Sequence, residues 1–86
     1  MKISKITLNF AAKRGIELEI DQDVIEFYEA GEDCEPMFTY NNNEENLSFR
    51  GNVYLKQSIK EELPATIFNE KQLREVISFM SEELAK

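Results

Sequence analysis

The most constraining feature of this chain is a change in the spacing of its apolar residues after Pro64. Before that point, apolar and polar residues alternate with a period of two, which predicts strands that have one solvated face. After Asn69 the apolar residues recur at helical spacing. The sequence therefore predicts an α+β fold, in which an antiparallel β-meander of four to five strands packs against one C-terminal α-helix in two layers.

The alternating part of the chain divides into several predicted strands. We expect strands over residues 5–10, 16–20, 24–29, 37–40 and 47–56, the last being one bent strand or two short ones. In the first of these, Ile6, Leu8 and Phe10 alternate with polar residues, and a turn ending at Gly15 would join it to the next strand as a β-hairpin. Gly51 interrupts the last pattern and predicts a bulge or bend there.

The predicted helix has a well-defined beginning. Asn69 is a favourable N-cap residue, and Gln72 stands three positions later, as in a capping box. Phe68 and Leu73 have the spacing of a hydrophobic staple across this cap. We therefore expect a helix from about residue 70 to residue 85.

Length and composition predict a single domain over residues 1–86 that is found in the cytoplasm. A domain of this size buries only ~60% of its unfolded surface, so a homodimer would add useful stability. No stretch approaches the ~20 apolar residues that cross a bilayer, and residues 1–10 do not resemble a signal peptide. The one cysteine, Cys34, fits a reducing compartment, and we expect no membrane partner.

The chain lacks histidine and has a single cysteine, two residue types on which many catalytic and metal sites depend. This composition excludes zinc clusters of Cys and His and nucleophile–histidine pairs. Asp21 and Asp23, or the carboxylates of residues 32–35, offer oxygen ligands without the EF-hand spacing. Its three glycines are scattered and form no phosphate-binding loop. We therefore expect a protein that is not an enzyme, with no catalytic residue, no bound metal and no cofactor.

Charge is distributed very unevenly along the chain. Between Gly15 and Asn46 there are eleven acidic residues and no Lys or Arg, whereas all ten bases lie outside that stretch. One interpretation is that these carboxylates only solvate the outer faces of strands. The other is that they form a surface for a basic protein partner, such as a nucleic-acid-processing enzyme. The residues that we expect to carry such binding are Glu17, Glu19, Glu26, Glu32, Asp33 and Glu35.

In size, charge and composition the chain resembles phage-encoded inhibitors of nucleic-acid machinery, such as anti-CRISPR and anti-restriction proteins, and toxin-immunity proteins. That resemblance implies a small non-enzymatic inhibitor, whose carboxylates occupy a surface that normally binds phosphates.

A second interpretation makes the chain a nucleic-acid-binding domain. Arg50, Tyr54 and Lys56 would share the polar face of the strand over 47–56, where they could stack on bases and hold phosphates. The order of strands before a capped helix, with the opening IFNEKQLREVISFM, resembles the single-stranded-DNA-binding coactivator family. Nucleic acid is a partner only under this interpretation.

Overall fold

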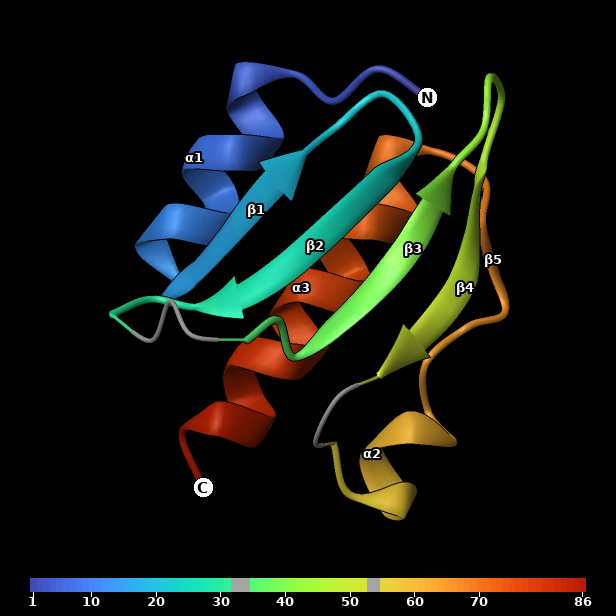
Figure 1. Cartoon of the computed structure of the whole chain (residues 1–86). Helices are drawn as coiled ribbons and strands as arrows, with labels where there is room; N and C mark the ends of the chain where they lie inside the picture. Colours follow the sequence, from blue (N-terminus) through green and yellow to red (C-terminus); the bar gives the residue numbers. More distant parts are fainter. Residues whose placement is uncertain (32–34, 53–54) are drawn as a thin grey trace.

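The computed structural model describes residues 1–31, 35–52 and 55–86 and has an α+β fold (Figure 1). Five antiparallel strands form one sheet in the order β1-β2-β3-β4-β5, which confirms the predicted fold class. In the described part of the chain, no helix has the length and apolar character needed to cross a membrane. The elements in chain order are α1 (Lys5–Lys13), β1 (Ile16–Ile20), β2 (Val24–Glu29), β3 (Phe38–Asn42), β4 (Leu47–Asn52), α2 (Gln57–Lys60), β5 (Thr66–Ile67) and α3 (Glu70–Leu84).

The N-terminal segment is a helix, so the strand and hairpin predicted from residue 5 onwards are wrong. Thr7 and Ala11, four residues apart, are completely buried, whereas Ile6 is 73% exposed. Burial thus follows helical spacing, and the alternation of Ile6, Leu8 and Phe10 does not decide the structure. Gly15 then turns the chain into β1 with a φ of 77°, a conformation that favours glycine.

A carboxylate of α3 joins the beginnings of the two long helices. Glu70 Oε1 accepts hydrogen bonds from the Ser4 N–H at 2.7 Å, the Ser4 hydroxyl at 2.8 Å and the Thr7 hydroxyl at 2.9 Å. Arg74 donates to the Thr7 hydroxyl oxygen at 3.1 Å. The bonds from Ser4, followed by those from Thr7 and the Arg74 charge, lower the pKa of Glu70. Glu70 therefore places a negative charge where both helices expose unpaired N–H groups.

The predicted beginning of α3 is confirmed, although one of its contacts differs. Asn69 accepts a hydrogen bond from the Gln72 N–H at 2.8 Å. The Gln72 side chain accepts from the Phe68 N–H at 2.8 Å, one residue earlier than in the usual capping box. Phe68 is 65% exposed while Leu73 is fully buried, so the expected hydrophobic staple is not a buried contact.

Aromatic side chains of neighbouring strands fill the space between the sheet and α3. Phe27 and Phe38 stack with their ring centroids 4.4 Å apart, and Tyr40 meets both rings edge-on. The Tyr40 hydroxyl donates to the Pro64 carbonyl at 2.7 Å, and burial raises the pKa of Tyr40. Each buried aromatic contributes a large apolar area, which explains how so small a domain has a defined core.

The register of β3 and β4 contains the irregularity predicted near Gly51. Thr39 pairs with Gly51 and Tyr40 pairs with Phe49, which leaves Arg50 as the extra residue of a bulge. β4 ends at Asn52, earlier than the predicted limit of 56. The two-residue strand β5, which pairs with the start of β4, was not predicted from the sequence.

Candidate functional site

One face of the sheet is not covered by either long helix. α1 and α3 contact each other; in Figure 1, α3 lies behind the sheet, and α1 lies beside β1 and partly behind it. Alternate residues of each strand therefore point to the helices or to the open face. The residues that alternation places on the open face are Glu17, Glu19, Val24, Glu26, Tyr28, Thr39, Asn41, Ser48 and Thr66.

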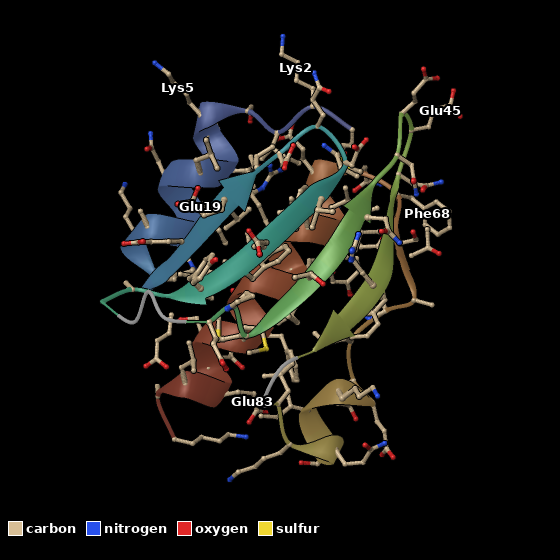
Figure 2. All side chains as sticks on the ribbon, in the orientation of Figure 1. Lys2, Lys5, Glu19, Glu45, Phe68 and Glu83 are labelled. Atoms are coloured by element: carbon tan, nitrogen blue, oxygen red, sulfur yellow. The ribbon has the colours of Figure 1, made fainter. Side chains whose placement is uncertain are left out.

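The carboxylates of this face gather on β1 and β2. Glu17 lies opposite Tyr28, and Glu19 lies opposite Glu26. These four side chains line a shallow hollow of about 260 Å³. We call this hollow and its four residues the acidic corner. Figure 2 labels Glu19 on β1, the outermost strand of the sheet.

The acidic corner does not neutralise its own charge. Glu19 and Glu26 face each other across the strand pair, where like charges are destabilising. In the ranges 1–31, 35–52 and 55–86, the only ion pair joins Lys86 to Glu83, far along the chain from these carboxylates. Lys5 extends away from the sheet in Figure 2. The three carboxylates therefore present a net negative surface to solvent.

The residues of β3 and β4 that alternation places on the open face are uncharged and form their own contacts. Asn41 donates to the Ser48 hydroxyl oxygen at 3.3 Å, and Asn43 donates to the same oxygen at 3.2 Å. Thr39 donates to the Gly51 carbonyl at 3.4 Å. These side chains thus bond within the molecule, and the carboxylates of the face belong to β1 and β2.

The structure brings together three of the six carboxylates predicted as binding residues, namely Glu17, Glu19 and Glu26. Glu35 is exposed in the loop before β3. The predictions for Glu32 and Asp33 lie outside the described residues. Tyr28 was not predicted as a site residue, although the alternation that placed Glu26 on the outer face also places Tyr28 there.

Arg50 and Lys56, which the nucleic-acid interpretation places on one strand, do not lie on the same strand in the structure. Arg50 is exposed on β4 at the bulge. Lys56 lies beyond the end of that strand, as the residue that precedes α2, so the two do not share a strand. Tyr54 lies outside the described residues. The helix α1 before the sheet is a further departure from the element order on which the resemblance to the coactivator family depends.

The described residues contain no cluster of metal ligands, and the chain matches no protein with which it was compared. Among the residues that the structure describes, no three Asp, Glu or Cys side chains converge on a point that could hold a metal ion. Comparison with protein-family models, with curated proteins and with solved structures gives no match.

Proposed function

We propose that this chain is a small, non-enzymatic binding protein that uses the acidic corner to engage a basic surface of a nucleic-acid-binding protein and so inhibits it. The observation that supports the proposal is the placement of Glu17, Glu19 and Glu26 side by side on a sheet face that neither long helix covers.

The arrangement has an energetic cost within the isolated molecule. A Glu19–Glu26 pair directly across two strands is less favourable than a neutral pair by ~0.2–1 kcal/mol. A neutral polar side chain such as Gln or Thr would be equally well solvated at these positions and would not cause that repulsion. The cost is recovered if a cationic partner neutralises the carboxylates on binding, and this is the physical reason to prefer a binding surface over a merely solvated one.

Inhibition follows from the kind of surface that such a face would complement. Proteins that bind nucleic acid present Lys and Arg side chains spaced for phosphate groups. A rigid sheet holds carboxylates at fixed separations, and Tyr28 adds an aromatic ring beside them. Because opposite charges accelerate association, such a protein would compete with nucleic acid for the basic surface.

The experiment compares two triple variants that have the same net charge. The corner variant is E17Q/E19Q/E26Q. The control variant is E44Q/E62Q/E82Q, which neutralises three exposed glutamates elsewhere on the molecule. Wild type and both variants are immobilised, and lysate of the source cell is passed over them at 0.05 and 0.5 M salt, where screening is weak and strong respectively.

We expect the wild type and the control variant to retain a nucleic-acid-binding protein at low salt and to release it at high salt. The corner variant should retain much less. The purified captured protein should then lose its nucleic-acid binding when wild type is added, but not when the corner variant is added. Equal capture by both triple variants would mean that the acidic corner is only a solvated surface.

A further inference from the structure

We infer that the free edge of β1 is where the partner attaches, by adding an extended basic segment to the sheet as a sixth strand. This inference rests on the proposed function and specifies how the acidic corner would be used. It concerns the backbone of β1, whereas the proposed function concerns only carboxylates.

The hydrogen bonds at the two ends of β1 show which backbone groups point outwards. The Ala30 N–H donates to the Gly15 carbonyl at 2.9 Å, and the Asp21 N–H donates to the Val24 carbonyl at 2.9 Å. In an antiparallel pair, hydrogen-bonded positions alternate with positions whose N–H and C=O point away from the neighbour. The odd-numbered residues of β1 therefore bond to β2, and the even-numbered residues direct their backbone groups to the free edge.

These outward groups belong to Ile16, Leu18 and Ile20. Ile16 is fully buried, whereas Leu18 is half-buried and Ile20 is 43% exposed. In the described part of the chain, β1 pairs only with β2, and α1 lies beside β1 and partly behind it in Figure 1. The outer half of β1 thus offers two residues with unpaired N–H and C=O groups to another strand.

A second copy of this chain does not fit that edge. The open face of β1 carries Glu17 and Glu19, so antiparallel pairing of β1 with another β1 through Leu18 and Ile20 places carboxylates opposite carboxylates. Like charges directly opposite are destabilising, and inward or flanking charges are a common protection against edge-to-edge association. The same charges favour a foreign strand whose side chains beside them are Lys or Arg.

The alternation of β1 also specifies the rest of the partner segment. Its residues beside Glu17 and Glu19 would lie on the open face and be basic. Its residues beside Leu18 and Ile20 would lie on the helix-facing side, where Ile20 is an exposed apolar neighbour. The fitting segment is therefore an extended protein strand in which basic and apolar residues alternate, bound through main-chain hydrogen bonds.

The test uses two synthetic peptides as probes, a ten-residue peptide of alternating lysine and valine and an isomer in which lysines and valines come in pairs. Their affinities are measured by fluorescence at low salt, and amide hydrogen exchange of the protein is followed by NMR. We expect the alternating peptide to bind more tightly than the isomer. At saturation it should slow exchange at the Leu18 and Ile20 amides at least ~10-fold, a factor that corresponds to one well-formed hydrogen bond.

Two single variants distinguish the contribution of the Ile20 backbone N–H to peptide binding from that of the Ile20 side chain. Ile20→Pro removes the outward N–H at a strand end that tolerates proline, whereas Ile20→Ala keeps the N–H and removes most of the side chain. We expect Ile20→Pro to lower the affinity for the alternating peptide about three- to tenfold more than Ile20→Ala does. This factor corresponds to the net contribution of one hydrogen bond. Since the exchange measurement uses wild type, the test does not depend on the folding of the proline variant.

The outcomes distinguish the inference from the proposed function. If binding requires Glu17 and Glu19 but exchange at Leu18 and Ile20 is unchanged, the carboxylates bind and the edge inference is overturned. If neither peptide binds, or binding is insensitive to E17Q/E19Q, the edge inference is overturned, while the proposed function is decided by the capture experiment with the two triple variants. A homodimer of wild type that protects the same two amides would show that a second copy occupies the edge, which also overturns the inference.

Discussion

Replacing Glu70 tests whether one carboxylate joins α1 to α3. Its Oε1 accepts three hydrogen bonds, two from Ser4 and one from Thr7. A hydrogen bond to a charged group contributes ~1.5–3 kcal/mol, but Glu70 lies near the surface and solvent screening reduces this. We therefore expect Glu70→Ala to lower the free energy of unfolding by ~2–3 kcal/mol in total. Glu70→Gln, which keeps an acceptor and loses the charge, should cost ~1 kcal/mol.

Urea unfolding followed by circular dichroism measures this loss. With a slope near ~1 kcal/mol per molar urea for a domain of this size, the midpoint should fall by ~2–3 M for Glu70→Ala and by ~1 M for Glu70→Gln. Glu75→Gln, an exposed position one turn further along α3, is the matched control and should change stability by less than ~0.5 kcal/mol.

The contribution of Glu70 also depends on pH, in a direction that the structure determines. Hydrogen bonds from Ser4 lower the pKa of folded Glu70 from its ordinary value of 4.5. The unfolded chain therefore takes up a proton at a higher pH than the folded chain does. The stability difference between wild type and Glu70→Gln should be constant above about pH 6 and should shrink as the pH falls through and below 4.5. An unchanged urea midpoint, or a difference that does not shrink in acid, would refute the role assigned to Glu70.

Three further predictions concern single residues of the fold. Asn69→Ala should lower the free energy of unfolding by ~1 kcal/mol, measured in urea, because it removes the cap of α3. Gly15→Ala should destabilise by ~1–2 kcal/mol, since Gly15 has a φ of 77°. Gly51→Ala is the comparison, because a methyl group there meets no neighbouring atom, and its Tm should stay equal or rise. Tyr40→Phe should cost ~1 kcal/mol by leaving the Pro64 carbonyl without its donor, and the Tm of the variant measures it.

The central and C-terminal parts of the fold follow from local patterns in the sequence. β1 and β2 alternate apolar with acidic or polar residues, so the alternation alone predicts which residues lie on each of their two faces. α3 combines a capping residue with a sustained helical stripe, and its predicted range is within one residue of the observed one. Because these strands are read correctly, Glu17, Glu19 and Glu26 were predictable as outward-facing residues.

The N-terminal helix was not predictable from alternation, because long-range contacts decide it. Five alternating residues fit a strand and a helix about equally well. The helix forms because it buries the Thr7 and Ala11 side chains on one face. The link from Glu70 to Ser4 spans 66 positions in sequence, which no local pattern reveals. β5 has two residues and is defined only by its pairing with β4. That the acidic corner lies on an uncovered face likewise depends on where both helices pack.

The most direct test of the account is the association rate of the captured partner with wild type, E17Q/E19Q/E26Q and E44Q/E62Q/E82Q, measured by stopped flow from 0.02 to 0.5 M salt. If the acidic corner binds the partner, the corner variant associates about tenfold more slowly than wild type at low salt, and its rate depends less on salt. The control variant, with the same net charge, stays close to wild type. Equal rates for the two variants across the salt range would contradict the account, because only net charge would then matter.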